Sequence, residues 1–417
     1  MLRSLTILDL RGYGELEASF GPGPHLVWGP NAAGKTSLLE AIVLLGWGRS
    51  HRTSADAELV RWGRDMARVE GLVEVREADG AGEAGEAGPA DTVAAGSGPV
   101  LAADRPVAIE VALVRGGAPG GRKRIRVDGA PRRTSGLTGL LRLVVFAPEE
   151  MLLIAGSPAL RRTALDTLAG QWSSAYARDL VTYARALQQR NALLRSIREE
   201  QASRAELRFW DEALLDAGAP LVAGRLALLE AVARPLAEAH AEIAPDEARE
   251  APLRIAYSTN APLLPGESPR DALARRLVET ADKEIWNGTT LVGPHRDDLV
   301  FEQAGRDLAT FASRGQQRTA ILAFKLAELD LLTALDGRPP LLLLDDVFSE
   351  LDPERRAHLV RRIAALPQAF VTTTTLDDLH PALRASATSW RVEPASGGVT
   401  AGAGAGTARL VGPEVPV

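Results

Sequence analysis

The sequence predicts an α/β fold in which a sheet with flanking helices is interrupted by a helical segment. Three observations predict it. Short apolar strands bounded by glycine turns dominate the first third, and strands alternate with helices again after Leu291. From Pro158 to about Ala241, leucine and alanine recur at the three- and four-residue spacing of helices. The run Leu341–Leu344 is wholly apolar, which is typical of a strand buried on both faces of a parallel sheet.

The N-terminal third is expected to hold several strands and one buried helix. The helix is expected over Ser37–Leu45, ending at Gly46. Strands are expected over Leu5–Leu10, Leu26–Trp28, Val69–Val75 and Val107–Val114, the last two as a pair. The stretch Ala78–Asp104, rich in Ala, Gly and Glu, cannot bury enough apolar surface to fold, so we predict a disordered loop inserted into that hairpin.

The helical segment is expected to contain two or three long helices with arginines on their outer face. Leu253–Ser258 is expected to be a strand and Pro265–Pro269 a loop. We therefore expect three parts along the chain. These are an N-terminal head part over 1–165, a helical arm domain over 166–288 and a C-terminal head part over 289–417.

The composition excludes several classes of protein. With 417 residues, 46% of them hydrophobic and 24% charged, the chain has ordinary globular composition. No apolar run reaches the ~20 residues of a membrane-spanning helix, and the start has no signal-peptide core, so we expect a cytoplasmic protein. The absence of cysteine excludes disulfides, Cys-ligated zinc, iron–sulfur clusters and thiol catalysis. The net charge of −6 means that nucleic-acid binding would need a local basic patch.

A phosphate-binding loop is the most specific local motif. The pattern G-x-x-x-x-G-K-S/T follows one predicted strand and opens the predicted helix. Backbone N–H groups of such a loop wrap phosphates, Lys35 reaches the β and γ oxygens, and the Thr36 hydroxyl binds Mg²⁺. The alternative, a glycine turn with an incidental lysine, does not explain the flanking strand and helix. The residues expected to bind ATP here are Gly29, Pro30, Asn31, Ala32, Ala33, Gly34, Lys35, Thr36 and Ser37.

Two acids follow the apolar strand Leu341–Leu344. An acid at the tip of a buried parallel strand lies at the carboxyl edge of the sheet, where ligands bind in open α/β folds. We therefore expect Asp345 to hold Mg²⁺ together with Thr36, and Asp346 to orient the attacking water. A pair of solvated acids is the alternative interpretation, and it leaves this placement unexplained.

A third motif stands about 30 residues before these acids. Ser313 can cap the long helix that follows, and Gly315 lets the backbone approach a phosphate. With Gln316, these residues resemble the signature motif of an ABC-type ATPase, expected to bind nucleotide. The segment Ser349–Asp352 resembles the D-loop of that class, and we expect Asp352 to bind nucleotide as well.

Taken together, the motifs resemble those of the bacterial RecF family of recombination mediators. GPNAAGKTSLLEAI, GRSHRT, LVGPHRDDLVF, SRGQQRTAILAFKLAE and LLLLDDVFSELD occur in the order of that family over nearly the whole chain. The resemblance implies an ABC-type P-loop ATPase head, similar to SMC heads, interrupted by a helical arm. It also implies dimerisation around ATP and Mg²⁺, binding of gapped DNA, action with RecO and RecR in loading recombinase, replication restart and support of the SOS response.

The sequence departs from common ABC patterns at a few positions. Ala32 stands where many ABC loops have glycine, although RecF-like loops often carry alanine there. Thr372–Thr375 occupies the place of the switch histidine of transporters, as the resemblance implies for this family. No glutamine fits the Q-loop by pattern.

A basic segment is the first candidate for DNA binding. Eight basic residues against one acid give a net charge of +7 between Arg115 and Arg142. We expect Arg122, Lys123 and Arg124 to lie on one rim of a hairpin and to contact phosphates, although a merely solvated rim is about equally compatible. The second candidate is the arginine face of the arm: Arg185, Arg190, Arg195, Arg198 and Arg204.

The family resemblance implies that the segment Gly293–Asp298 is a polar turn that supports the nucleotide-binding lobe. A metal-ligand role for His295 is the alternative, and no second histidine or acid cluster supports it. Two other functions stay open. One is a transporter-type ATPase subunit, which would need a membrane-coupling subdomain and usually a switch histidine. The other is a nucleotide-gated DNA scaffold with negligible turnover, which an ATPase assay with and without DNA would distinguish from a weak DNA-stimulated ATPase.

Overall fold

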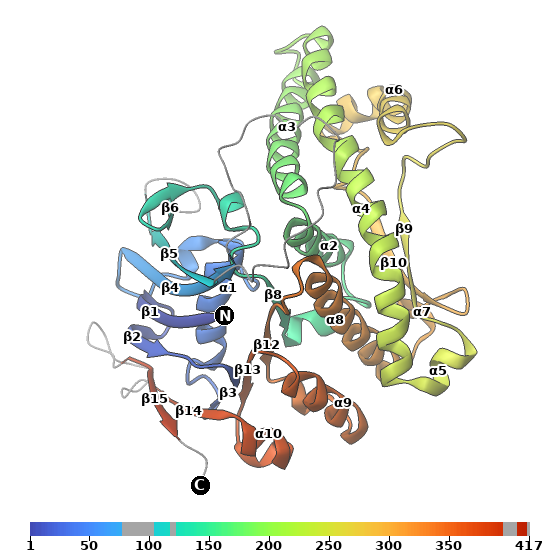
Figure 1. Cartoon of the computed structure of the whole chain (residues 1–417). Helices are drawn as coiled ribbons and strands as arrows, with labels where there is room; N and C mark the ends of the chain where they lie inside the picture. The colour runs from blue at the N-terminus through green and yellow to red at the C-terminus, as the bar shows by residue number, and fades with distance from the viewer. Residues whose placement is uncertain (77–103, 117–121, 395–406, 415–417) are drawn as a thin grey trace, which may run out of the picture. The chain divides into compact units, whose positions relative to one another are not determined.

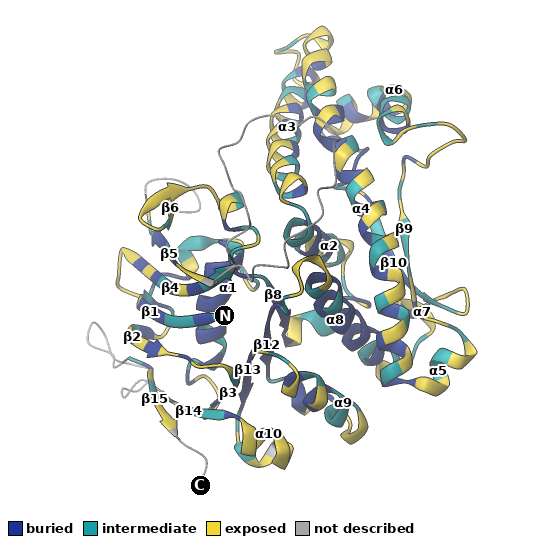
Figure 2. Cartoon of the chain, in the orientation of Figure 1, coloured by how far each residue is buried: buried dark blue, intermediate teal, exposed yellow. Residues whose placement is uncertain are grey.

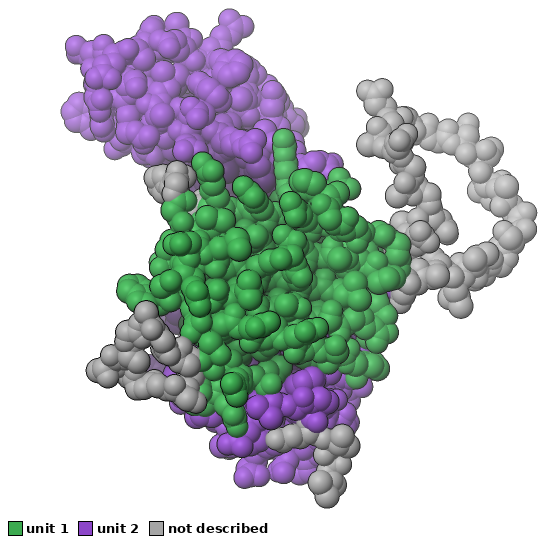
Figure 3. Space-filling model, turned by 90° about the vertical axis from the view of Figure 1, so that its left-hand side faces the viewer, with its two compact units in different colours: residues 1–22, 40–141, 393–410 green, residues 23–39, 142–392, 411–417 purple. Residues whose placement is uncertain are grey.

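The structure is a computed structural model that describes residues 1–76, 104–116, 122–394 and 407–414 (Figure 1). It comprises two compact units (Figure 3). Unit 1 contains residues 1–22, 40–141 and 393–410, and unit 2 contains residues 23–39, 142–392 and 411–417. The helical segment belongs to unit 2, so the two units do not coincide with the three parts expected along the chain. The division into those three domains stays a prediction. The loop expected over 78–104 lies outside the described residues except for Asp104.

Unit 1 is built on a six-stranded antiparallel sheet with the order β2-β1-β4-β5-β6-β7. Its strands are β1 (Leu2–Leu10), β2 (Tyr13–Ser19), β4 (Met66–Arg76), β5 (Asp104–Val114), β6 (Arg122–Val127) and β7 (Ala130–Arg132). The expected pairing of Val69–Val75 with Val107–Val114 is confirmed, with Val73 opposite Val107. Apolar residues of alternating positions form the inner face, as period-two burial requires.

Helix α1 (Lys35–Trp47) connects the phosphate-binding loop of unit 2 to unit 1. Its C-terminal half packs closely on the sheet of unit 1, because a Cβ on Gly71 would lie 2.3 Å from the Leu45 side chain. The expected end of this helix at Gly46 is wrong. The helix continues to Trp47, and Gly48 follows with a φ of 63°.

Unit 2 is built on a second six-stranded sheet with the order β15-β14-β3-β13-β12-β8. The strands are β3 (Gly23–Trp28), β8 (Leu143–Phe146), β12 (Leu341–Asp345), β13 (Gln368–Thr373), β14 (Thr388–Glu393) and β15 (Arg409–Glu414). The five strands from β14 to β8 run parallel. Strand β12 is buried at every residue, as expected for Leu341–Leu344, and Figure 2 shows it dark.

Helices cover this sheet and form the arm. Three helices fill the expected helical segment: α2 (Pro158–Trp172), α3 (Ser174–Arg198) and α4 (Leu207–Ile243). The others in unit 2 are α5 (Pro245–Glu250), α6 (Pro269–Asn287), α7 (Leu308–Phe311), α8 (Arg314–Asp336), α9 (Pro353–Ala364) and α10 (Pro381–Ser386). Helix α4 lies beside α8 (Figure 1), and both contribute leucines to one large core. Within the described residues no helix is long and apolar enough to cross a membrane.

A small antiparallel sheet completes unit 2, in the order β11-β10-β9. Its strands are β9 (Arg254–Ser258), β10 (Asp298–Gln303) and β11 (Arg306–Asp307). Strand β9 confirms the strand expected over Leu253–Ser258. The expected loop Pro265–Pro269 ends where α6 begins.

Candidate nucleotide-binding site

The strand register of unit 2 brings two distant motifs to the same sheet edge. Strand β13 lies between β3 and β12, with Trp28 opposite Thr373 and Asp345 opposite Thr372. All three strands are parallel, so their carboxyl ends meet. The loop that follows β3 and the acids that end β12 are therefore separated by a single strand, at the edge where open α/β sheets bind ligands.

The loop from Gly29 to Thr36 has a backbone that few residue types can adopt. Gly29 has a φ of 153°, and a Cβ there would lie 2.4 Å from the Val392 carbonyl oxygen. Gly34 has a φ of 117°. Ala32 has a φ of 61°, a left-handed conformation that costs a non-glycine residue ~1–2 kcal/mol. The position where many ABC loops carry glycine thus keeps the glycine-like conformation with an alanine.

Lys35 is the first residue of α1 and is 8% exposed. Its Nζ donates hydrogen bonds to the carbonyl oxygens of Gly29 at 2.7 Å and Pro30 at 3.0 Å. Burial lowers the pKa of this ammonium, although Asp346 and Asp345 attract the charge. An ammonium held inside the loop, at the N-terminus of a 13-residue helix, can bind a chain of phosphates.

The two acids after β12 have different environments. Asp345 is 4% exposed, and its Oδ1 accepts a hydrogen bond of 2.6 Å from the Thr372 hydroxyl. That hydroxyl oxygen also accepts a hydrogen bond of 2.9 Å from the backbone N–H of Asp346. Asp346 itself is left-handed, with a φ of 53°. The Thr372 hydroxyl therefore holds both acids: it contacts the side-chain carboxylate of Asp345 and the backbone N–H of Asp346.

The oxygen ligands at this edge suit Mg²⁺. A buried carboxylate on Asp345 and the half-buried hydroxyl of Thr36 are hard oxygen donors. Among the described residues, no group of three or more His, Cys, Asp or Glu side chains could hold a metal ion. Few protein ligands suit Mg²⁺, which usually keeps several waters and shares its site with phosphate oxygens.

The signature segment begins α8 with a capping box. The Ser313 hydroxyl accepts a hydrogen bond of 3.2 Å from the Gln316 N–H, and the Gln316 side chain accepts one of 3.0 Å from the Ser313 N–H. The expected cap is confirmed. Gly315 is exposed, and a Cβ there would meet only the Ser313 hydroxyl, at 3.8 Å. Within the described residues, no neighbouring atom requires a glycine at that position.

The D-loop segment is held by its own helix. The Asp352 carboxylate accepts a hydrogen bond of 3.0 Å from the Arg355 N–H and caps α9, and it forms an ion pair with the Arg355 side chain. Arg318 of α8 forms an ion pair with Glu350. These contacts tie the signature helix to the D-loop within one chain.

Both ring nitrogens of His295 contact other groups of the chain. Its Nδ1 lies 2.6 Å from the Tyr183 hydroxyl and its Nε2 lies 3.2 Å from the Thr290 carbonyl oxygen, so both ring nitrogens are engaged. Burial lowers the pKa of His295 to about 4. Arg225 of α4 donates a hydrogen bond of 2.6 Å to the Pro294 carbonyl oxygen. The polar turn thus holds the arm helices together.

One expected DNA contact, Arg190, is wrong, and the expected single rim of Arg122, Lys123 and Arg124 is wrong as well. Arg190 is 2% exposed and lies in the arm, where it contacts Asp211 and Glu284, each at 2.7 Å. Lys123 does not share a face with Arg122 and Arg124, because successive strand residues point to opposite sides. It is half-buried and forms an ion pair of 2.9 Å with Asp56.

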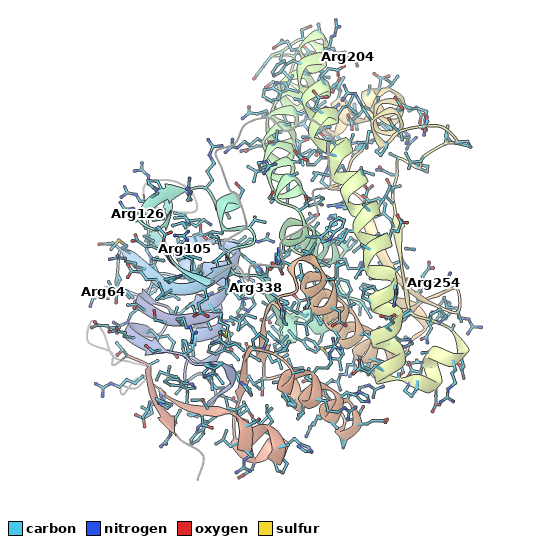
Figure 4. All side chains as sticks on the ribbon, viewed as in Figure 1. Arg64, Arg105, Arg126, Arg204, Arg254 and Arg338 are labelled. Atoms are coloured by element: carbon cyan, nitrogen blue, oxygen red, sulfur yellow. The ribbon has the colours of Figure 1, made fainter. Side chains whose placement is uncertain are left out.

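The exposed face of β6 instead carries three alternate arginines. Arg122, Arg124 and Arg126 are all exposed, whereas Ile125 between them is buried. Figure 4 labels Arg126 together with Arg64 and Arg105 on unit 1. The exposed Arg195 of α3 stays a candidate for DNA binding.

Comparison with known proteins identifies the family. The family profile described as RecF/RecN/SMC N terminal domain matches residues 1–393. A protein of Chloroflexus aggregans named DNA replication and repair protein RecF is 40% identical over 409 residues, covering 94% of this chain and 98% of that protein. The chain belongs to the RecF family. The RecF of Geobacillus thermodenitrificans is 38% identical over 403 residues, covering 95% of this chain and 98% of that protein.

The fold of this RecF-family chain is also that of solved relatives. Two structures of the recombination mediator protein RecF in the RecFOR pathway, described as RecF-ATP and RecF-ATPrS, match with a TM-score of 0.78. Each is 30% identical and covers 94% of this chain and 95% of that chain. The expected ABC-type head, with mixed sheets, flanking helices and long helices in the middle of the chain, is therefore confirmed.

Sequence reasoning missed the positioning role of Thr372 in this RecF-family site. The run Thr372–Thr375 indicates the position that a switch histidine occupies in transporters, but it does not predict the hydrogen bond from Thr372 to Asp345. That contact depends on the register between β12 and β13, which no local pattern encodes. Glu149 is a second residue that pattern reasoning passed over. It follows β8, whose Phe146 pairs with Leu344, so it lies near the same sheet edge.

Proposed function

We propose that this RecF-family protein is an ATP-dependent DNA-binding protein of replication and recombinational repair. It would bind ATP and Mg²⁺ at the edge formed by β3, β13 and β12 and hydrolyse ATP slowly, as a switch. The observation that supports the proposal is the parallel register of β3, β13 and β12, in which Trp28, just before the loop with Lys35, pairs with Thr373 and Asp345 pairs with Thr372. The names of the solved relatives, RecF-ATP and RecF-ATPrS, support the choice of nucleotide.

Each side chain of the site would have a separate task. Thr36 and Asp345 would hold Mg²⁺, which when bound would neutralise charge on the transferred phosphoryl group. Lys35 would exchange its bonds to the Gly29 and Pro30 carbonyl oxygens for phosphate oxygens. Asp346 would accept a hydrogen bond from the attacking water. The Thr372 hydroxyl would hold the Asp345 side chain and the Asp346 backbone in different orientations, so that the two acids can have different tasks.

The signature segment supports a composite site made by two copies of the chain. Ser313 and Gly315 lie exposed at the start of α8, a 23-residue helix whose N-terminus attracts anions. Glycine at an exposed helix position is unfavourable unless something else approaches its backbone. We infer that the γ-phosphate held by a second copy makes that approach, so that ATP joins two copies.

DNA binding would use the arginine face of β6. Arg122, Arg124 and Arg126 span roughly 14 Å at ~3.4 Å per residue, about the axial length of four nucleotides of one strand. The chain has a net charge of −6, so a single copy would bind DNA weakly and two faces in a dimer would bind better. Gapped DNA as substrate, RecO and RecR as partners, support of the SOS response and a cytoplasmic location belong to the same proposal.

The transporter alternative is less compatible with this site. The Thr373 hydroxyl donates a hydrogen bond of 2.8 Å to the Thr375 carbonyl oxygen, so the position of the switch histidine is used within its own loop. An ATPase assay with and without gapped DNA tests the proposal. We expect slow hydrolysis that DNA stimulates. No turnover, with ATP still driving dimerisation, would favour the nucleotide-gated scaffold, and no ATP binding would refute the proposal.

A further inference from the structure

The turn before β4 exposes a tryptophan. The Arg64 N–H donates a hydrogen bond of 3.1 Å to the Arg61 carbonyl oxygen, which closes a tight turn with Trp62 and Gly63 at its tip. Gly63 has a φ of 78°, as the turn requires. Trp62 is 91% exposed, more than any other large apolar residue in the described part of the chain. Its indole contributes almost nothing to the core, so packing does not explain its presence.

One arginine lies over this indole, and two more are near it in the sequence. The guanidinium carbon of Arg115 lies 5.9 Å from the centre of the Trp62 ring, and the Arg115 Nη2 donates a hydrogen bond of 2.6 Å to the Val60 carbonyl oxygen. Arg61 and Arg64 each approach Asp9 at 3.4 Å. Three arginines, Arg61, Arg64 and Arg115, thus stand against two acids, Asp9 and the adjoining Asp65, which leaves a net charge of +1 at the turn.

The turn lies at one end of the arginine face of β6. Val114, the last residue of β5, pairs with Met66 on one side and with Arg122 on the other. Met66 is the first residue of β4, directly after the turn. The row that runs from Arg126 through Arg124 to Arg122 therefore leads toward the end of the sheet that carries Trp62.

An exposed flat ring among arginines is the chemistry that binds unpaired nucleotides. A base stacks on an aromatic ring whatever its sequence, while the neighbouring guanidinium groups neutralise the phosphates. A second exposed tryptophan gives a contrast. Trp286 of α6 is 81% exposed, and the side chains four and three residues earlier on its face are Asp282 and Lys283, an acid and a base whose charges cancel. Among the described residues, Trp62 is the exposed tryptophan that has an arginine over its ring.

We propose that Trp62 stacks on an unpaired base of a gap, beside duplex DNA that lies along Arg122, Arg124 and Arg126. This inference rests on the proposed DNA binding and names the part of the DNA that this end of unit 1 recognises. The arginine row contacts the phosphates of the paired region in any DNA. Trp62 then supplies the preference for a junction over a continuous duplex.

The test is the affinity of the full-length protein with ATP for gapped DNA, for continuous duplex and for a single-stranded oligonucleotide, measured by fluorescence anisotropy. Trp62→Ala should weaken binding to gapped and single-stranded DNA roughly 5- to 150-fold and leave duplex binding unchanged. Trp62→Phe should retain most of the affinity. Trp286→Ala, the matched control, should bind all three DNAs like wild type.

Two outcomes would overturn the inference and leave the proposed function intact. One is a Trp62→Ala variant that prefers gapped DNA as wild type does, which would leave the exposed indole for a protein partner. The other is an equal loss for duplex and gapped DNA in both Trp62 variants. By contrast, a wild-type protein that binds none of the three DNAs would refute the proposed DNA binding itself.

Discussion

Gly315 offers a substitution that should help one copy of the chain and prevent two from joining. Alanine is favoured over glycine in helices by ~0.5–1 kcal/mol, and the lower value applies to the first turn of α8. The new Cβ would meet only the Ser313 hydroxyl, at 3.8 Å, which is an ordinary contact distance. Gly315→Ala should therefore raise the thermal midpoint of the monomer by about 1–2 °C at most, and should not lower it.

The same methyl group should obstruct the composite site. A phosphate that approaches the Gly315 backbone in a second copy would meet the added carbon, and overpacking of this kind costs ~1–3 kcal/mol. ATP-dependent dimerisation should weaken about 5- to 150-fold, while ATP binding by the monomer is retained. The assay is light scattering with ATP and Mg²⁺, beside a direct measurement of ATP binding.

Gly170→Ala is a matched control. Gly170 is a helical glycine of α2, and a Cβ there would also have its nearest neighbour at 3.8 Å, the Ala177 Cβ. This variant should gain the same helical stability and dimerise like wild type. If Gly315→Ala dimerises with ATP as well as Gly170→Ala does, the signature segment does not contact nucleotide in a second copy. A lowered thermal midpoint for Gly315→Ala would mean that a Cβ at this position clashes within a single copy of the chain.

Three further substitutions address the catalytic edge. Lys35→Arg should keep much of the ATP affinity but lose hydrolysis, because a broad guanidinium cannot replace a compact ammonium inside the loop. Wild-type turnover in this variant would refute the role of Lys35. Asp346→Asn should retain ATP binding and accumulate dimer, since Asp345 still holds Mg²⁺. Equal loss of binding and turnover would instead mean that the two acids have exchanged roles. Thr372→Val should lower the ATPase rate roughly 10- to 100-fold, because it removes the hydrogen bond to Asp345. Thr372→Ser should restore most of the ATPase rate. The measurement is a steady-state assay over a range of Mg²⁺ concentrations. A Thr372→Val enzyme as active as wild type at low Mg²⁺ would remove the positioning role.

Local motifs were predictable because their physical determinants are local. The phosphate-binding loop needs a strand, two glycines and a lysine that are close in sequence, and the capping box of Ser313 needs only Gln316 three residues later. The apolar run of β12 identified a buried strand for the same reason. These features were read correctly from the residues alone.

Contacts between distant segments were not predictable in this way. The spacing of residues within a single helix predicts an outer face for Arg190. The burial of Arg190 depends on its ion-pair partners Asp211 and Glu284, which come from two other helices, α4 and α6. Lys123 illustrates a different error, since charge density was weighed without the alternation of the strand. Thr372 depended on the register of β12 and β13, and Trp62 became informative only when its exposure was known.

The central claim, that ATP closes two copies into the form that binds DNA, is tested most directly by salt-dependent DNA affinity in defined nucleotide states. Asp346→Asn with ATP should bind gapped DNA tightly and with a steep dependence on salt, because both arginine faces release counterions. The same variant without nucleotide should bind weakly, and so should Ser313→Arg with ATP. Replacing Arg124 and Arg126 by glutamate should flatten the salt dependence. Tight binding by the Ser313→Arg monomer, unchanged by ATP, would contradict the account.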